Sequence, residues 1–192
     1  MLDISYAKNT GHWEHWWPQY QFGAFYIFPP EEIMVLVDGL REQYDPKSAG
    51  ICRAHISLSE PLDHPMTIEE LEQLRSDLAG FKPFRISCGP IRMHPPYPGV
   101  TFTIQPEREF SELRSRIHGL PVFRDVEIKR STIDPHMTIA EFITMERSIE
   151  IMEELQDKIP NREFICDHIE LAVPNDDFYF ERVLRVTLGA GG

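Results

Sequence analysis

The sequence of 192 residues predicts an α+β fold in which two duplicated lobes face each other across a groove. Each lobe is expected to have an antiparallel sheet with helices on its outer side, so that the groove lies between the two sheets. Two observations predict this arrangement. A β-rich run followed by an amphipathic helix recurs along the chain, and equivalent landmarks of the two halves lie roughly 80 residues apart. We therefore expect one bilobal domain with halves at about residues 21–96 and 97–188, and leave open whether the lobes exchange strands.

The first half contains two successions of strand and helix and one further strand. Residues 23–29 form a β-rich run that stops at two prolines, and residues 51–58 read as a second strand. A capping box at Thr67 and Glu70 predicts the start of the second helix, and Gly80 predicts its end. Residues 84–88 begin the third strand. Helical spacing predicts that the following residues point inward: Ile33, Leu36, Val37, Leu40 and Tyr44 in the first helix, and Ile68, Leu71, Leu74 and Leu78 in the second.

The second half repeats this order. Residues 100–106 and 133–139 read as strands, each followed by a helix, and residues 164–168 begin another strand after Pro160. The first 20 residues lack both periods and are rich in tryptophan, so we expect an irregular arm (residues 1–20) that packs on the body. The inward positions of the two helices are expected to be Phe110, Leu113 and Ile117, then Ile149, Met152, Leu155 and Ile159.

Composition limits the classes of protein to which the chain can belong. It is 42% hydrophobic, yet no run approaches the roughly 20 apolar residues of a membrane span, and no apolar run follows a basic start. Cys52, Cys88 and Cys166 lie in strand-like runs, which is typical of free, buried thiols in a reducing compartment. We therefore expect a cytoplasmic protein without membrane contact.

The net charge argues against long nucleic acids as ligands. The chain has 19 basic and 31 acidic residues, which gives a net charge of −12. Since proteins bind polynucleotides chiefly by neutralising phosphates with lysine and arginine, such a chain would repel a long strand. A small nucleotide or an RNA end needs only a few local cations and stays compatible with this charge.

Two tetrapeptides share the order histidine, apolar, hydroxyl, apolar: His55 with Ser57, and His136 with Thr138. Because side chains alternate along a strand, each histidine is expected to share one face with its hydroxyl, while the apolar residues face the core. One such tetrapeptide is typical of an ordinary half-exposed strand. Two copies at equivalent points of a duplication predict instead that both polar faces meet at one site.

These two motifs and the order of elements around them resemble the two-histidine (2H) phosphoesterase superfamily, which includes the 2′-5′ RNA ligase-like proteins and the cyclic phosphodiesterases. The resemblance extends from about residue 22 to about residue 188 and leaves the arm outside. It implies that His55 and His136 are catalytic and face each other over a phosphate in the groove. It also implies that Ser57 and Thr138 hold the phosphate oxygens. Ser57 stands where threonine is commoner in the family, which keeps the hydroxyl.

Two histidines suffice for phosphodiester hydrolysis without a metal or another cofactor. A neutral imidazole can take a proton from the attacking water while a charged one protonates the leaving oxygen, and the ordinary histidine pKa of about 6.5 permits both states. The sequence leaves the two roles open. Asp134 would raise the pKa of His136, which favours His136 as the acid.

Four further residues are candidates for substrate binding. Arg53 shares the parity of His55 and could reach the phosphate, and Arg130 precedes the second motif. Arg92 and Tyr97 lie in the proline-rich stretch 92–98, which is expected to be a stiff turn before the first strand of the second half. No cysteine pair or zinc-binding pattern accompanies the other histidines, so we expect no metal site.

The resemblance implies hydrolysis of a 2′,3′-cyclic or related cyclic phosphodiester on a small nucleotide or an RNA end. Two alternatives stay open: an enzyme that cleaves or joins 2′-5′ linkages in short oligonucleotides, and a module that binds a phosphate or nucleotide without turnover. Both motifs are intact, which favours an enzyme over a binding module. The sequence does not determine the natural substrate, the product isomer or the oligomeric state.

Overall fold

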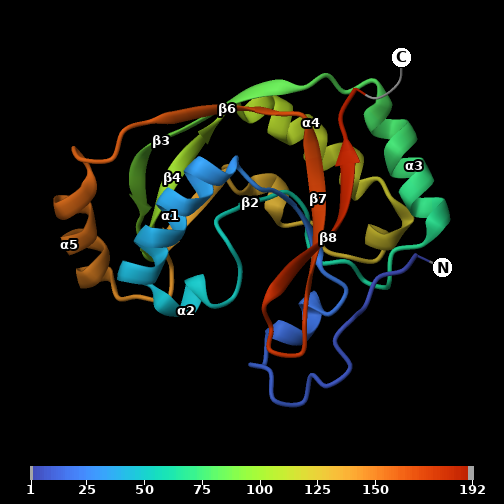
Figure 1. Cartoon of the computed structure of the whole chain (residues 1–192), viewed down its shortest axis with the longest axis horizontal. Coiled ribbons are helices and arrows are strands. Elements are labelled where there is room, and N and C mark those ends of the chain that lie inside the picture. The colour runs from blue at the N-terminus through green and yellow to red at the C-terminus, as the bar shows by residue number, and fades with distance from the viewer. Residues whose placement is uncertain (1, 190–192) are drawn as a thin grey trace.

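Figure 1 shows the computed structural model of the chain, which describes residues 2–189. Within these residues the fold is α+β, as predicted, with eight strands in one antiparallel sheet of order β6-β3-β4-β5-β2-β1-β7-β8. The strands are β1 (Ala24–Ile27), β2 (Ile56–Ser57), β3 (Phe84–His94), β4 (Tyr97–Gln105), β5 (His136–Ala140), β6 (Arg162–Cys166), β7 (His168–Pro174) and β8 (Phe180–Thr187). The helices are α1 (Glu31–Tyr44), α2 (Pro46–Ala49), α3 (Ile68–Ala79), α4 (Glu107–His118) and α5 (Met145–Leu155), with short 3-10 turns η1 (Trp17–Tyr20), η2 (Pro121–Phe123) and η3 (Arg130–Thr132).

The helices gather at two ends of the molecule. α1 and α2 lie on the same side as α5, whereas α3 and α4 lie together on the other side (Figure 1). α4 buries Phe110, Leu113 and Ile117 completely, as their spacing predicted. α3 begins with the predicted capping box, in which the Thr67 hydroxyl accepts from the Glu70 amide and the Glu70 carboxylate accepts from the Thr67 amide. Local signals therefore set where α3 begins and which side of α4 is buried.

The sheet is continuous, whereas two separate sheets were expected. β6, β3, β4 and β5 lie on one side of the contact between β5 and β2, and β1, β7 and β8 follow β2 on the other side. That contact has a single register pair, Ile56 with Met137, so the two sides of the sheet join over a very short stretch. β3, from the first half of the chain, lies among strands of the second half. The two sides of the sheet therefore do not coincide with the two halves of the sequence.

The buried faces of α3 and α5 differ from the prediction at two positions, and Ile159, a third predicted position, lies beyond α5, which ends at Leu155. Ile68 is 43% exposed at the first position of α3, and Ile149 is 47% exposed in α5. Ser148 is buried in place of Ile149, because its hydroxyl accepts the Gly99 amide and donates to the Thr144 carbonyl. A hydroxyl with both bonds made can occupy a buried position, which a pattern of apolar residues does not reveal.

The strands that carry the two motifs are shorter than expected. β2 covers only the last part of the run 51–58, because the carbonyl of Cys52 accepts a hydrogen bond from Arg41 rather than from a strand. The proline-rich stretch 92–98 is the turn of a hairpin between β3 and β4, whose last pair is His94 with Tyr97. The hairpin of β7 and β8 was not predicted, and it adds the outer edge of the sheet beyond β1.

Residues 2–20 are irregular apart from η1, and their tryptophans contact the turn between β7 and β8. Trp13 is buried against Phe178 with ring centroids 4.9 Å apart, and Trp17 stacks on the same ring at 4.0 Å. Phe178 has a φ of 60°, a conformation that bulky residues rarely adopt, and its side chain is fully buried. The arm and the β7–β8 turn therefore form one aromatic cluster beside the sheet.

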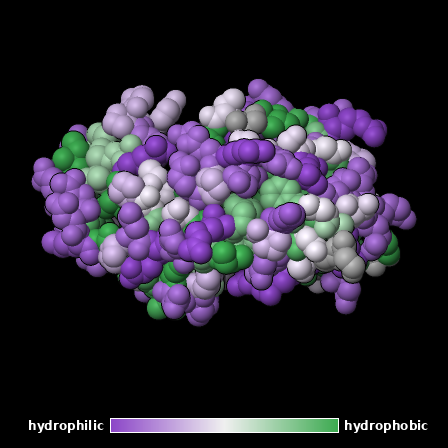
Figure 2. All heavy atoms as spheres, turned by 90° about the horizontal axis from the view of Figure 1, so that it is seen from above, coloured by the Kyte–Doolittle hydropathy of each residue, from purple (hydrophilic) through white to green (hydrophobic). Residues whose placement is uncertain are grey.

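One face of the molecule is largely polar (Figure 2), and the thiols lie inside. The face in Figure 2 is largely hydrophilic, with hydrophobic side chains visible mainly between polar ones. Cys52, Cys88 and Cys166 are free and buried, as predicted. No helix in the described part of the chain is both long and apolar enough to cross a membrane.

Replacement of Thr67 tests whether the capping box stabilises the start of α3. Thr67→Ala removes the hydroxyl that accepts the Glu70 amide and is expected to lower the free energy of unfolding by about 1 kcal/mol. Urea denaturation followed by circular dichroism measures the change. Thr67→Ser keeps the hydroxyl and serves as the control. An alanine variant that is as stable as the serine variant would contradict the cap.

Candidate active site

The two motifs lie side by side at the junction of the sheet. Ile56 pairs with Met137, and both side chains are fully buried on the core face, as the strand parity predicted. In an antiparallel ladder, directly opposed side chains have Cβ atoms about 4.5–5.5 Å apart. This register places each histidine opposite the hydroxyl of the other motif: His55 opposite Thr138, and Ser57 opposite His136.

All four of these polar side chains line one cavity of about 150 Å³. Arg130 and Glu141 also line it and add one positive and one negative group. An adjacent outer pocket of about 570 Å³ shares His136 and Thr138 with the cavity and extends toward His94. The reactive groups therefore lie in a small inner chamber beside a roomier one. The wall of the inner chamber is aromatic and consists of Trp16, Tyr20, Tyr26, Phe142, Phe178 and Phe180.

The two histidines are held in the same way. Nδ1 of His55 is 2.7 Å from the carbonyl oxygen of Arg53, and Nδ1 of His136 is 2.8 Å from that of Asp134. Since a carbonyl only accepts, Nδ1 of each neutral ring carries the proton and donates it. Nε2 of each ring then has its lone pair available to a ligand. The carbonyl two residues before each histidine thus sets its tautomer.

The environment keeps both rings neutral at pH 7. Burial, and then the Arg41 guanidinium, lower the pKa of His55 to about 3. Burial also lowers the pKa of His136, while the hydrogen bond to the Asp134 carbonyl raises it. The sequence argument relied instead on the Asp134 carboxylate, which pairs with Arg92 at 3.0 Å. The pKa of His55 is the more strongly lowered, so His136 is the ring that takes up a proton more readily.

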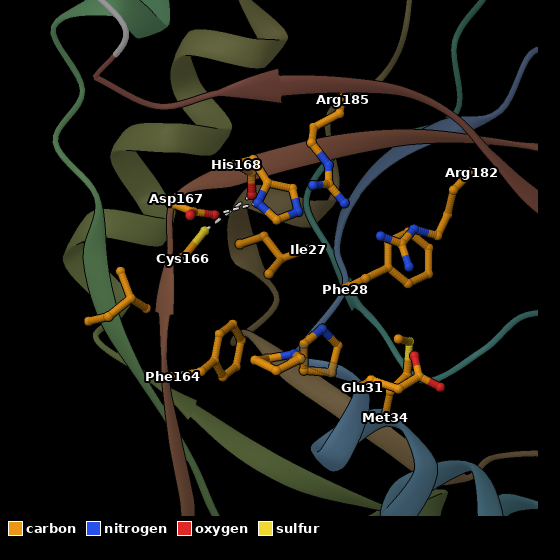
Figure 3. A pocket seen from close by; sticks show the side chains of 13 residues that line it. Ile27, Phe28, Glu31, Met34, Phe164, Cys166, Asp167, His168, Arg182 and Arg185 are labelled. Carbon is orange, nitrogen blue, oxygen red and sulfur yellow. Dashed lines mark hydrogen bonds and ion pairs between the residues drawn. The ribbon is translucent and has the colours of Figure 1, made fainter.

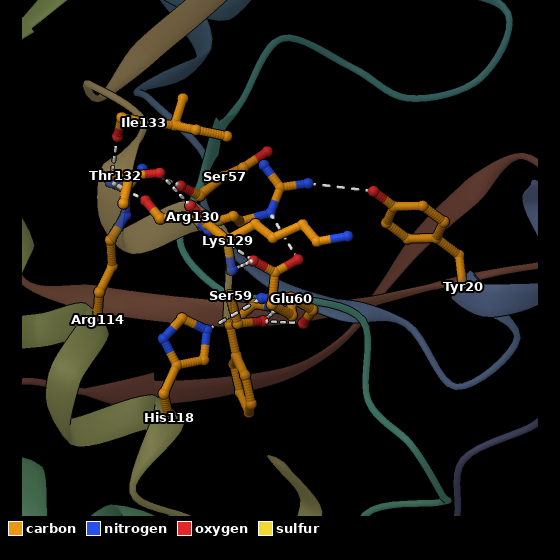
Figure 4. A network of polar contacts seen from close by, with 11 residues as sticks. Tyr20, Ser57, Ser59, Glu60, Arg114, His118, Lys129, Arg130, Thr132 and Ile133 are labelled. Carbon is orange, nitrogen blue, oxygen red and sulfur yellow. Dashed lines mark hydrogen bonds and ion pairs between the residues drawn. The ribbon is translucent and has the colours of Figure 1, made fainter. Parts of the chain in front are cut away.

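Arg130 is the one of the four further candidates that lines the inner cavity. Figure 4 shows the network of polar contacts around it. Its Nη2 donates to the Tyr20 hydroxyl at 3.1 Å. The Glu60 carboxylate accepts the amides of Lys129 and Arg130 at 2.8 and 2.6 Å, and the Glu60 amide donates to Nε2 of His118. Glu60 thus fixes the backbone from which Arg130 reaches the cavity. No motif in the sequence marked Glu60, because its partners are backbone groups distant in the chain.

The structure does not bring the other three candidates into the inner cavity. Arg53 was expected to reach the phosphate, but its guanidinium binds the carboxylates of Glu31 and Asp38. Arg92 binds the carboxylate of Asp134. Tyr97 is 73% exposed and lines only the outer pocket. Parity placed Arg53 correctly beside the motif, but two acidic residues of α1 bind its charge.

Another pocket, of about 390 Å³, lies at the end of β1, beside β8 and the link between β6 and β7 (Figure 3). Its charged groups are already paired: Arg182 binds both oxygens of Glu170, and His168 faces the carboxylates of Asp167 and Glu170. None of the motif side chains lines it. Among the described residues, no three histidine, cysteine, aspartate or glutamate side chains converge as metal ligands.

A sheet that brings two histidine-hydroxyl motifs into one cavity defines the class of two-histidine phosphoesterases. The family model of the 2′-5′ RNA ligase superfamily matches residues 29–177. The chain therefore belongs to this superfamily. The comparison with curated proteins gives no match.

Solved structures share the fold. LigT of E. coli complexed with 3′-AMP has a TM-score of 0.54 at 18% identity, with 86% of this chain and 95% of that chain covered. The protein TT0787 of Thermus thermophilus has a TM-score of 0.53 at 15% identity, with 86% and 97% covered. A further phosphoesterase has a TM-score of 0.53 at 19% identity, with 86% and 96% covered. At these identities the similarity is evidence for the fold alone.

The neutral state of His55 predicts a dependence of stability on pH. The pKa of about 3 in the folded chain lies below the ordinary value, so the unfolded chain binds an extra proton between these values. The free energy of unfolding is therefore highest above about pH 6.5 and decreases as the pH falls toward about 3. His55 alone is expected to lower it by about 2 kcal/mol between pH 7 and pH 5. Urea denaturation at pH 7 and pH 5 measures it.

His55→Gln provides the control for this measurement, because glutamine does not titrate. The wild-type chain is expected to lose about 2 kcal/mol more than this variant between pH 7 and pH 5. His118, whose pKa burial lowers to about 4, titrates in both chains and cancels in the comparison. Equal losses in the two chains would show that His55 is not buried in the neutral form.

Proposed function

We propose that the chain hydrolyses a 2′,3′-cyclic or related cyclic phosphodiester on a small nucleotide or an RNA end, with His55 and His136 as base and acid and without a metal. The observation that carries this proposal is the cross-strand register of the two motifs. Each ring has Nε2 available beside the hydroxyl of the other motif, so one phosphate can contact both rings and both hydroxyls.

The proposed reaction is an in-line displacement at phosphorus. Nε2 of His55 takes a proton from water, the water oxygen forms a bond to phosphorus, and the bond from phosphorus to one ribose oxygen breaks. His136 gives that leaving oxygen a proton. The anionic phosphate raises the pKa of the ring beside it, which supplies the charged form of His136. Ser57, Thr138 and Arg130 stabilise the charge on the non-bridging oxygens.

The two chambers suit a nucleotide. The inner cavity of about 150 Å³ holds the reactive groups, and the outer pocket of about 570 Å³ offers Tyr97 and Ile133 as apolar surfaces for a base or ribose. The 73% exposure of Tyr97 leaves its ring face accessible for stacking. Solved structures of E. coli LigT with 3′-AMP, ATP and NADP+ support small nucleotides as the ligand class.

The superfamily also supports a second candidate, an enzyme that cleaves or joins 2′-5′ linkages in short oligonucleotides. The same two histidines would serve it, since a linkage between nucleotides is a phosphodiester too. The net charge of −12 keeps the substrate short in either case. A module that binds a nucleotide without turnover is the third possibility, and its hallmark would be affinity without product.

Removal of either histidine is expected to abolish most turnover. EDTA-treated wild-type protein, His55→Ala and His136→Ala are incubated with 2′,3′-cyclic nucleotides and with short 2′-5′ oligonucleotides, and the products are separated by chromatography. Each variant is expected to lose about 10²- to 10⁴-fold in kcat, because it lacks one proton-transfer group. His64→Ala, a half-exposed histidine outside both chambers, serves as the control.

The outcome separates the candidates. Turnover of oligonucleotides alone favours the second candidate, and binding without any product favours the third. Loss of wild-type activity on EDTA treatment would contradict the metal-free mechanism. Full activity of either alanine variant would remove that histidine from the chemistry.

The hydroxyl of Thr138 is expected to act in the transition state. Thr138→Val has nearly the same shape but lacks the hydroxyl, so kcat is expected to fall about 10²-fold while KM changes little. Thr138→Ser keeps the hydroxyl and is expected to retain most activity. Steady-state kinetics on the substrate identified above measures both. A valine variant that changes KM alone would assign Thr138 to ground-state binding.

A further inference from the structure

Two buried arginines reach the motif strands from opposite halves of the chain. Arg41 on α1 is 2% exposed, and Arg114 on α4 is 5% exposed. Neither was recognised in the sequence, where each occupies a position on the buried face of an amphipathic helix. Arginine is almost never fully buried unless its charge is paired, so two such residues at one site require an explanation.

The two arginines make equivalent contacts. Arg41 donates to the carbonyl of Cys52 at 2.8 Å and to that of Thr138 at 3.1 Å. Arg114 donates to the carbonyl of Ile133 at 2.6 Å and to that of Ser57 at 3.1 Å. Each guanidinium therefore ties the residue three before one histidine to the residue two after the other histidine. The four hydrogen bonds thus connect the two motif segments on both sides of the single residue pair that joins β2 and β5.

Neither guanidinium has a carboxylate within ion-pair distance among the described residues. Every hydrogen-bond acceptor that they contact is a neutral carbonyl, including Ser48 for Arg41 and Arg130 for Arg114. Nε of each has no partner in the described part of the chain. Burial lowers the pKa of Arg114 to about 10, which still leaves it charged at neutral pH. Two positive charges therefore lie in the interior without a carboxylate in direct contact; the negative groups that act on them from farther away are Glu141 for Arg41, and Glu60 and Asp134 for Arg114.

We propose that Arg41 and Arg114 are positioning residues that lock the two motifs in register and supply a fixed positive potential, for which the phosphate of the substrate is the counter-charge. An anion in the inner cavity offsets the cost of burying these cations, since opposite charges attract strongly in a medium of low dielectric constant. The same potential adds to burial, which is the larger cause, in keeping the histidines neutral until an anion binds. The substrate class comes from the proposed function, whereas the potential does not depend on turnover.

The charged and titratable groups that act on the two rings come from several elements. His55 is subject to Arg41 on α1, Arg130 on η3 and His136 on β5, and Tyr26 on β1 packs against it. His136 is subject to His94 on β3, Arg114 on α4 and Arg130. Glu141 also lines the cavity. Removal of one positive charge is therefore expected to raise the pKa of the ring that it faces.

The experiment compares Arg41→Met and Arg114→Met, which remove the charge, with Arg41→Lys and Arg114→Lys, which keep the charge but lose the planar fork. Histidine titrations by ¹⁵N NMR and affinity for inorganic phosphate are measured on each full-length chain. The methionine variants are expected to raise the pKa of His55 or His136, respectively, and to weaken phosphate binding roughly tenfold. The lysine variants are expected to bind phosphate within a few-fold of wild type, with a lower kcat and an unchanged KM.

Arg75→Met, which removes a half-exposed arginine of α3 that pairs with Glu72, is the matched control and is expected to change nothing. Folded methionine variants with wild-type titrations and phosphate affinity would overturn the potential. If the methionine variants do not fold, lysine variants with wild-type kcat would overturn the positioning role. If the wild-type chain turns over no nucleotide, the titrations and phosphate binding still decide this proposal, while the proposed function fails.

Discussion

The contact between β2 and β5 is the constraint on which the rest of the structure depends. It has one register pair, Ile56 with Met137, and it joins the two sides of an eight-stranded sheet. Both of these side chains pack into the core, so their neighbours along the strands must point to the opposite face. The contact that joins the two sides of the sheet is therefore also the contact that brings the two histidines and the two hydroxyls together.

A junction of one residue pair needs support from outside the ladder. Arg41 and Arg114 provide it with hydrogen bonds to carbonyls of both motif strands. Their matched contacts also support the proposed duplication, since equivalent residues of two related halves would make equivalent bonds. Side chains from one half that bind the strand of the other half make the halves interdependent, which favours a single cooperative unit over two independent lobes.

Features that depend on neighbours in the sequence were predictable. The face shared by His55 and Ser57, the cap at Thr67 and the buried side of α4 follow from the periods of strands and helices. The single sheet was not predictable, because strand order depends on contacts between distant residues. The burial of Ser148 was missed for the same reason, since its hydroxyl binds Gly99 from another element.

In the candidate site, too, local patterns were predictable, whereas contacts between distant residues were not. The motifs revealed the residues that have chemistry of their own, but not the residues that act through them. Glu60 and Arg114 bind backbone groups of the loop before His136, and backbone groups leave no trace in sequence patterns. Arg53 does not line the inner cavity, and Glu31 and Asp38, acidic residues distant in the sequence, bind its guanidinium. The alternation of side chains along a strand predicts the direction in which a side chain points, whereas the residues that it contacts depend on the fold.

The distribution of charge supports the proposal that this acidic protein binds a single phosphate. The net charge is −12, yet Arg41, Arg114 and Arg130 all lie at or beneath the two motifs. At physiological ionic strength the screening length is about 8 Å, so a long polyanion meets the acidic exterior, whereas buried cations act nearly unscreened on a group inside the cavity. A single phosphate in a chamber of about 150 Å³ would meet these cations away from the acidic exterior, with Glu141 as the one carboxylate among the described lining residues. The contrast between exterior and cavity therefore favours small or terminal phosphates over internal positions of a long strand.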